Sequence, residues 1–354
     1  MAFLWRRVLR ICAVLSVFAV LAIWWTREIP EVVSTTRYTT PLPPLGATPR
    51  MPESCFVFLT RSMSLTKVRR TMFDIEQRFN RRFKYPYVFL GEQRFSPEFQ
   101  HAVRAMASGD VTFAIIDDWD APAWVDLRRV DTERRPMGFR NMVRYWAQPF
   151  ALHPALKDYT FVWRLEPGAH FTCDFVDDPF RRMQTSNLSY AFAMSIEEVP
   201  SSAPSVWPRV LDYIKKLPRN SNNNSLAWIA ESDRRFNRCQ FLTNFELVDL
   251  RFIRSRAYQL LFKYLDEQAG FYYELWSDAT VRSLAAALLL DASKVQWLGD
   301  IGYSHDLLSN CPADPERQKR CHCDPAASSH LLPMSCSTRW SESLHVDTQS
   351  FLTL

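Results

Sequence analysis

Glu166 is the first residue whose type and position suit chemistry. It follows the apolar run Phe161–Leu165 and precedes Pro167, which cannot donate to a strand ladder, so we expect its carboxylate at the edge of a sheet. A carboxylate there could bind a divalent cation, and the cation could bind the oxygens of a diphosphate. The alternative is a solvated loop glutamate without a chemical role.

Glu246 is the second such residue. It lies in Phe241–Glu246, where we expect Asn244 and Glu246 to share one face of an extended segment. Because Phe241 and Phe245 flank it, burial would disfavour the charged form of the carboxylate, and a compensating partner would be needed. The residue is therefore either a group with a chemical role or a buried glutamate paired with an arginine for structure.

Asp278 and His305 complete the set of candidate residues. Asp278 lies where it could cap the apolar helix that follows, and capping would not exclude a contact with substrate. His305 is expected in a polar loop before Cys311. A lone histidine indicates little, but His305 and Glu166 together could form a metal site that leaves positions open for phosphate and water.

Several function classes are excluded by what the sequence lacks. It contains no Walker loop, no glycine-rich dinucleotide turn and no nucleophile elbow, which excludes the common NTPases, dehydrogenases and serine hydrolases. The formal net charge is only +5, and basic residues alternate with acidic ones. Without a dense basic stripe, binding to nucleic acid is not expected.

The elements that position these residues alternate between strand and helix. The apolar patterns predict strands at 55–60, 87–90, 111–116, 161–165, 190–194 and 295–298, and helices at 65–83, 97–106, 252–266 and 279–290. This order predicts an α/β fold with a mostly parallel sheet and ligands at the carboxyl ends of its strands. No linker divides residues 53–340, so we expect one domain, with room for two lobes.

An apolar run near the N-terminus predicts insertion into a membrane. It extends from Ile11 to Trp25 and follows Arg6, Arg7 and Arg10. The run is shorter than the ~20 residues of a typical span and would also fit the core of a signal peptide. Because no small-residue cleavage pattern follows and the tryptophans suit a membrane interface, we favour an uncleaved signal anchor with a cytoplasmic N-terminus. The expected parts are a cytoplasmic tail (1–10), a signal-anchor transmembrane segment (11–26), a stem (27–52) and a lumenal catalytic domain (53–354).

Cysteines and glycosylation motifs fit a lumenal domain. Cys12 lies in the apolar run, and seven cysteines follow it: Cys55, Cys173, Cys239, Cys311, Cys321, Cys323 and Cys336. In an oxidising compartment most should pair, and the odd number leaves at least one free or paired between chains. Zinc binding by the late cysteines and His322 is the alternative, although Cys-x-Cys is not a usual zinc spacing. Asn187 and Asn223 begin the glycosylation pattern Asn-x-Ser.

Many ordered motifs resemble the fungal KTR-type α-1,2-mannosyltransferases of glycosyltransferase family 15. The likeness runs from Cys55 to Trp340. It includes Tyr85–Leu90, Tyr145–His153, Trp163–Gly168, Asp177–Phe180, Thr243–Glu246, Phe271–Trp276, Asp300–Tyr303, Cys321–Pro325, Ser335-Cys336 and Arg339-Trp340. The resemblance implies a type II Golgi membrane protein with a GT-A-like fold that uses GDP-mannose and Mn²⁺. It further implies transfer of mannose to mannose-bearing glycans of O- or N-glycosylation with retention of configuration.

The resemblance also assigns roles by position. Glu166 and His305 match the family's metal ligands, Glu246 matches the carboxylate proposed as nucleophile, and Asp278 matches an acidic residue of the active site. Glu246 would act by double displacement or by stabilising positive charge during front-face attack, and the sequence does not choose between them. Gly168 leaves the metal motif without a second carboxylate, which the family tolerates.

Three further residues are expected to contact the nucleotide sugar. Arg61 and Arg164 suit a diphosphate because a planar guanidinium matches its oxygens. Phe139 stands where the family commonly has a tyrosine, so a hydroxyl is lost there. The alternatives to this mannosyltransferase activity are a catalytically weakened glycan-binding member of the family and a glycosyltransferase with another nucleotide-sugar donor.

Overall fold

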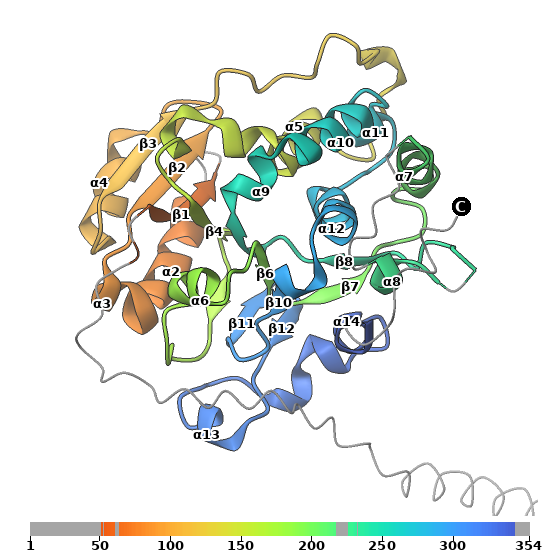
Figure 1. Cartoon of the computed structure of the whole chain (residues 1–354). Coiled ribbons are helices and arrows are strands. Elements are labelled where there is room, and N and C mark those ends of the chain that lie inside the picture. The colour runs from red at the N-terminus through yellow and green to blue at the C-terminus, as the bar shows by residue number, and fades with distance from the viewer. Residues whose placement is uncertain (1–50, 52, 61–63, 217–225, 232, 344–354) are drawn as a thin grey trace, which may run out of the picture. The chain divides into compact units, whose positions relative to one another are not determined.

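The computed structural model describes residues 51, 53–60, 64–216, 226–231 and 233–343 (Figure 1). The chain divides into two units, 1–43 and 44–354, and every described residue belongs to the second. The expected tail and signal anchor, and all of the expected stem except Met51, lie outside the described residues. Within the described ranges, no helix is long and apolar enough to cross a membrane. Met51 is buried, and its N–H donates to the Tyr85 hydroxyl at 2.6 Å, so it belongs to the folded domain.

A seven-stranded mixed sheet forms the centre of the domain, in the order β10-β6-β9-β4-β1-β2-β3. Its strands are β1 (Ser54–Leu59), β2 (Tyr87–Gly91), β3 (Val111–Ile115), β4 (Phe161–Leu165), β6 (Tyr190–Phe192), β9 (Phe245–Asp249) and β10 (Val295–Trp297). Neighbouring strands run parallel, except that β9 is antiparallel to both β4 and β6. The predicted α/β class and mostly parallel sheet are confirmed.

Each face of the sheet has its own apolar core because successive strand residues point to opposite faces. Phe56 and Phe58 of β1 belong to a core rich in aromatic residues, whereas Val57 and Leu59 belong to the other core. Helices on the aromatic side are α2 (Leu65–Ile75), α4 (Pro97–Met106) and α6 (Pro179–Thr185). A π-helical turn, Glu76–Asn80, continues α2 into α3 (Arg81–Phe83).

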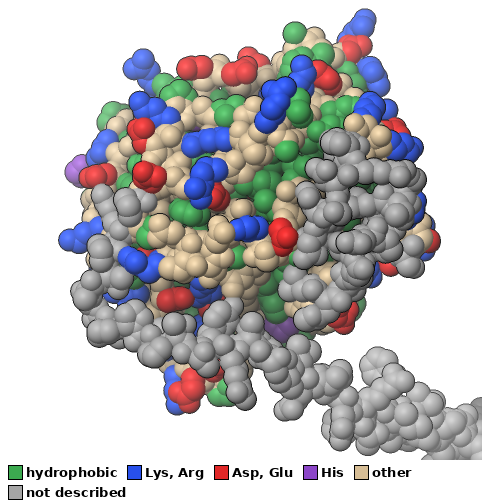
Figure 2. Space-filling view, viewed as in Figure 1, with side chains coloured by type: hydrophobic (Ala, Val, Ile, Leu, Met, Phe, Trp, Pro, Cys, Tyr) green, Lys and Arg blue, Asp and Glu red, His purple; other side chains and the backbone are tan. Residues whose placement is uncertain are grey.

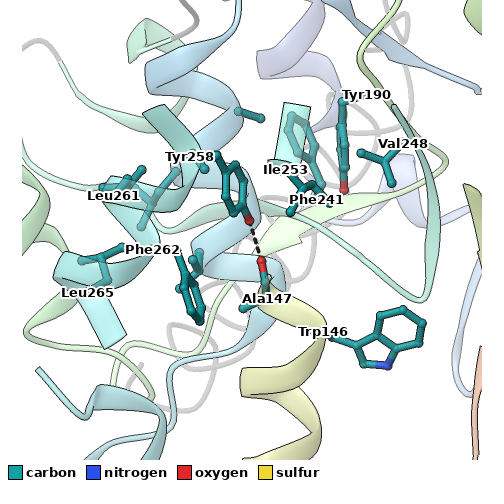
Figure 3. Packing of buried hydrophobic residues seen from close by; sticks show 14 of the residues in the cluster. Trp146, Ala147, Tyr190, Phe241, Val248, Ile253, Tyr258, Leu261, Phe262 and Leu265 are labelled. Carbon is teal, nitrogen blue, oxygen red and sulfur yellow. Dashed lines mark hydrogen bonds between the residues drawn. The ribbon is translucent and has the colours of Figure 1, made fainter. Parts of the chain in front are cut away.

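The second core packs against most of the remaining helices. These are α5 (Met137–Ala147), α7 (Val206–Ile214), α8 (Leu226–Ile229), α9 (Leu250–Arg254), α10 (Arg256–Asp266), α11 (Gly270–Tyr273) and α12 (Asp278–Leu289). Figure 3 shows part of this core, where the Tyr258 hydroxyl of α10 donates to the Ala147 carbonyl oxygen of α5 at 2.6 Å. This side of the sheet carries the candidate site.

Shorter elements complete the domain. A three-stranded sheet contains β5 (His170–Phe171), β11 (Tyr303–His305) and β12 (Leu308–Asn310), and β7 (Ser195–Glu197) pairs with β8 (Cys239–Phe241). The last α-helices are α13 (Pro315–Gln318) and α14 (Ser337–Ser343). Short 3-10 helices cover Leu127–Arg129, Pro149–Leu152, Pro154–Leu156, Ala292–Lys294, Pro325–Ala327 and Ser329–Leu331.

Three disulfides confirm the expected cysteine pairing. The pairs are Cys173–Cys321, Cys239–Cys336 and Cys311–Cys323, and Cys55 is free and buried. Among the described residues, the sole cluster of three potential metal ligands is Cys173, Cys321 and Cys323, and all three are in disulfides. The zinc alternative is therefore wrong, because a disulfide sulfur is not a thiolate ligand.

Two predicted elements differ from the structure. The helix expected over 252–266 is two helices, because Ser255 adopts an extended conformation and caps α10 by accepting from the Tyr258 N–H at 3.2 Å. The strand expected over 190–194 ends at Phe192. The other predicted strands and helices agree with the structure to within a few residues.

Candidate active site

The carboxyl end of β4 and the start of β9 bring Glu166 and Asn244 together. These strands are antiparallel neighbours, and their last pair is Leu165 with Phe245. Glu166 and Asn244 are the next residues beyond that pair, so both lie at this edge of the sheet. The predicted position of Glu166 is confirmed.

A turn separates Asn244 from the strand that carries Glu246. The Phe245 N–H donates to the Leu242 carbonyl oxygen at 3.3 Å, and β9 begins only at Phe245. The expectation of one extended segment with Asn244 and Glu246 on the same face is therefore wrong. The turn sends the two side chains to different partners.

His305 is the partner of Asn244. Its Nδ1 lies 3.3 Å from the Asn244 Nδ2, and the Tyr303 hydroxyl donates to the Asn244 backbone oxygen at 2.7 Å. His305 ends strand β11 instead of lying in the expected polar loop, because it pairs with Leu308 across a hairpin. His305, which was predicted as a pair with Glu166, thus contacts Asn244, and Glu166 lies at the same edge of the sheet.

Arg164 links Glu166 to Asp278. Its Nε and Nη2 donate to Glu166 Oε1 at 2.8 and 2.5 Å, and its Nη1 donates to Asp278 Oδ2. The guanidinium carbon lies 4.1 Å from the centre of the Trp146 ring, close enough for a cation–π contact. Burial alone would lower the pKa of Arg164, but the carboxylates around it, Asp278 foremost, raise that pKa. We expected this guanidinium at a diphosphate, and the structure places it against two carboxylates.

Asp278 is the first residue of α12 and not its cap. Ser277 is the N-cap, and its hydroxyl accepts from the Thr280 N–H at 3.0 Å. The Asp278 carboxylate is instead engaged by Arg164 and by the Thr243 hydroxyl, which donates to Oδ2 at 2.7 Å. The expected capping role is therefore wrong, because tertiary partners outcompete the local one.

Glu246 is buried against an arginine that the sequence reasoning missed. Glu246 is 1% exposed and Arg282 is 0% exposed, and Arg282 Nε lies 3.0 Å from Glu246 Oε1. Within the described residues, however, neither carboxylate oxygen accepts a hydrogen bond of good geometry. Arg282 donates instead to the Tyr258 hydroxyl at 2.6 Å and to the Trp146 carbonyl oxygen at 2.8 Å. Arg282 lies within an otherwise apolar helix, and this pattern could have predicted a buried arginine paired with a carboxylate.

The surroundings of Glu246 shift its ionisation. Burial raises the pKa of Glu246, the cations Arg282 and Arg164 lower it, and Asp278 raises it, with a net upward shift. The carboxylate therefore depends on two guanidinium groups for its charge. A group of this kind can stabilise positive charge that develops nearby.

Comparisons with known proteins identify the family. The model of the glycolipid 2-alpha-mannosyltransferase family matches residues 28–345. The chain belongs to this family, glycosyltransferase family 15. It is 34% identical over 313 residues to glycolipid 2-alpha-mannosyltransferase 2 of Candida albicans, which covers 84% of this chain and 68% of the relative.

Two solved structures of family 15 members share the fold. One is core-mannan synthase A (CmsA/Ktr4) of Aspergillus fumigatus in its Mn/GDP form, with 30% identity, a TM-score of 0.77 and coverage of 83% of this chain and 86% of that chain. The other is the mannosyltransferase Ktr4p of S. cerevisiae in complex with GDP, with 31% identity, a TM-score of 0.79 and coverage of 85% and 84%. The mixed α/β sheet found here is thus that of family 15 structures.

The candidate metal ligands of this family 15 chain fit a hard divalent cation. In the described structure Glu166 Oε1 is taken by Arg164, whereas no hydrogen bond uses Oε2. Asn244 Oδ1 is buried without a partner among the described residues, and Asn244 Nδ2 faces His305 Nδ1. Exchanging the amide oxygen and nitrogen, which have nearly the same shape, would let Nδ1–H donate to Oδ1 and leave Nε2 with a lone pair for metal. One carboxylate oxygen and one imidazole nitrogen are suitable donors for manganese.

The other predicted site residues lie elsewhere or outside the described part. Phe139 is a partly buried residue of α5, with the Arg135 guanidinium carbon 5.3 Å from its ring centre. Asn187 is exposed in the turn that follows α6. Arg61 and Asn223 lie outside the described residues.

Proposed function

We propose that this protein is a retaining α-1,2-mannosyltransferase that transfers mannose from GDP-mannose to mannose-bearing glycans. The observation that carries the proposal is the convergence of Glu166, Asn244 and His305 beside the buried group of Arg164, Glu246 and Asp278. Family 15 membership and the GDP-bound relatives support the choice of donor.

A bound Mn²⁺ would supply positive charge to neutralise the departing diphosphate. Glu166 and His305 would hold the ion in this chain. The Asn244 amide would fix the tautomer of the His305 imidazole. Arg164 donates two hydrogen bonds to Glu166 Oε1 and thereby orients the other carboxylate oxygen, Oε2. These contacts hold the proposed ligands before any ion binds, which reduces the cost of organising the site.

Glu246 supplies negative charge near the sugar's anomeric carbon in this proposal. Its ion pair with Arg282 weakens it as a nucleophile, and at 1% exposure its oxygens are shielded from direct contact with an anomeric carbon. Both features favour a carboxylate that stabilises an oxocarbenium-like charge during front-face attack over one that forms a covalent intermediate. The acceptor hydroxyl would then pass its proton to the leaving phosphate.

We further propose a type II Golgi membrane protein with its catalytic domain in the lumen. The apolar run 11–25 with its preceding arginines supports an anchor, and the three disulfides support an oxidising compartment. Asn187 is exposed and would be glycosylated there. Protease protection of the domain in intact vesicles, together with an endoglycosidase-sensitive mass shift lost in Asn187→Gln, tests this topology.

The direct test of function is transfer by the purified full-length chain to α-methyl mannoside. GDP-mannose is offered with Mn²⁺ or with EDTA, and a panel of other nucleotide sugars tests donor choice. We expect an α-1,2-linked product that requires Mn²⁺ and that Glu246→Gln nearly abolishes. No transfer by folded protein, even to larger mannosides, would favour a glycan-binding role and direct attention to Phe139.

A further inference from the structure

A cavity of about 450 Å³ lies between α10 and the loop that carries Trp124. Its lining consists of Trp124, Gln148, Arg256, Gln259, Leu260, Phe262, Lys263, Asp266 and Glu267. None of these residues belongs to the candidate active site. The two are nevertheless close along the chain, because Trp146 of α5 contacts Arg164 and Gln148, which follows that helix, lines the cavity.

Trp124 forms a preformed aromatic wall of this cavity. It is 53% exposed, yet its indole N–H donates to the Asp266 carbonyl oxygen at 3.2 Å. Arg144 holds the Asp266 carboxylate through two hydrogen bonds of 2.8 Å, and its guanidinium carbon lies 5.9 Å from the centre of the Trp124 ring. The ring is therefore fixed in orientation while much of its surface faces water. An exposed and fixed indole offers a surface on which the apolar face of a ligand can stack.

Amide and charged groups surround that wall. Gln148 and Gln259 bring side-chain amides, and Lys263 pairs with Glu267 at 3.4 Å. Arg256 forms no ion pair within the described part of the chain. Because three of the four charged side chains in the lining are paired, Lys263 with Glu267 and Asp266 with Arg144, the cavity favours a neutral, hydroxyl-rich ligand over a phosphate. Figure 2 shows the same interspersion of acidic and basic side chains over the face that it draws.

We propose that this cavity binds a mannose-containing oligosaccharide at a site separate from the transfer site. A pyranose has C–H groups on its face and hydroxyl groups around its edge, which match an indole wall with surrounding amides. The volume lies within the ~300–1,000 Å³ typical of small-molecule sites. The choice of mannose rests on the proposed function, since the acceptor would carry that sugar. A second site of this kind would raise the effective concentration of a branched acceptor at the transfer site.

The test measures binding without donor and without Mn²⁺, so that it does not depend on transfer. α-1,2-Mannotriose is titrated into the full-length protein, followed by saturation-transfer NMR. We expect Trp124→Ala to weaken binding about tenfold, whereas Phe73→Ala, which removes an equally exposed aromatic ring on α2, leaves it unchanged. Gln259→Ala should also weaken binding, and as an exposed substitution it does not put folding at risk. Unchanged binding in both Trp124→Ala and Gln259→Ala, or equal binding of cellobiose, would overturn the proposal.

Transfer assays separate this inference from the proposed function. Trp124→Ala should leave transfer to α-methyl mannoside unchanged, because a single sugar occupies only the transfer site, and should raise KM for larger mannosides. If the wild type transfers mannose but Trp124→Ala does not weaken binding, the second site alone is refuted. If Trp124→Ala weakens binding but the wild type transfers no mannose, the proposed activity is refuted and the binding site is supported.

Discussion

Two buried glutamates on opposite sides of the sheet are held in different ways. Glu76, on the aromatic side, is 2% exposed, and its Oε1 accepts hydrogen bonds from the Tyr87 hydroxyl at 2.6 Å, Asn80 Nδ2 at 3.0 Å and the Ser108 N–H at 3.3 Å. Glu246, on the other side, is 1% exposed and faces the Arg282 guanidinium without an aligned hydrogen bond.

The difference separates a structural carboxylate from one available for chemistry. Neutral donors fix Glu76 Oε1 to three neighbours and use its acceptor capacity, whereas Oε2 is buried without a partner among the described residues. The Arg282 guanidinium favours the ionised form of Glu246 by its charge. Because it makes no aligned hydrogen bond, it leaves the carboxylate lone pairs unused. Burial alone therefore does not distinguish the two roles, whereas the type of partner does.

The largest expected effect is the loss of transfer in Glu246→Gln. The substitution removes the charge with little change in shape, and we expect kcat to fall by about 10³-fold, as for the removal of electrostatic stabilisation in other active sites. The measurement is kcat at saturating GDP-mannose and Mn²⁺, with circular dichroism to verify folding. Retention of a tenth or more of wild-type kcat would show that Glu246 resembles Glu76 in role.

Arg282→Met should shift the pH dependence of transfer. The pKa of Glu246 is already above its ordinary value, and loss of the cation raises it further. Because the ionised form exists above this pKa and is lost as pH falls through it, the acidic limb of the kcat/KM profile should move to higher pH. Breaking a buried ion pair should also destabilise the fold by about 3–5 kcal/mol.

A matched control for Arg282 is Arg182→Met. Arg182 forms a partly buried ion pair with Asp177 and Asp300, and it has no contact with Glu246 among the described residues. This variant should lose stability without moving the acidic limb. If both variants shift the profile equally, the effect is a general consequence of destabilisation.

Asn244→Ala should weaken Mn²⁺ binding by about 10–100-fold, the usual range for a residue that orients a metal ligand. The physical reason is that the amide no longer fixes the tautomer of His305. Electron paramagnetic resonance of free Mn²⁺ measures the affinity without donor or turnover. Asn310→Ala removes a buried asparagine, whose Nδ2 donates to the Ile301 carbonyl oxygen at 2.7 Å, and should leave the affinity unchanged.

The smallest effect is expected for Glu76→Gln. Glutamine keeps an acceptor oxygen for Tyr87 and Asn80, so the free energy of unfolding should fall by only about 1–2 kcal/mol. Transfer should remain within about threefold of wild type, since the contact is remote from the site. Chemical denaturation and kcat together check this result, and a large loss of kcat would remove the distinction between the two glutamates.

Local patterns in the sequence were sufficient for most elements. The helix predicted over 97–106 is α4 to the residue, because Ser96 caps it and Pro97 suits its first turn. The apolar run before Pro167 likewise predicted β4 and the position of Glu166 at its end. Such features depend on neighbours within a few residues, which a sequence displays directly.

Contacts between distant segments required the tertiary structure. Asp278 was expected to cap its own helix, yet Arg164, 114 residues away, holds its carboxylate. Spacing along the chain gave no indication that Arg282 would face Glu246 or that Asn244 would face His305. The sequence by itself determined most of the strands and helices and indicated which residues are candidates for chemistry. Only the packing of β4, β9, β11 and α12 decided which charges meet, because the free energy of a buried charge depends on its spatial neighbours.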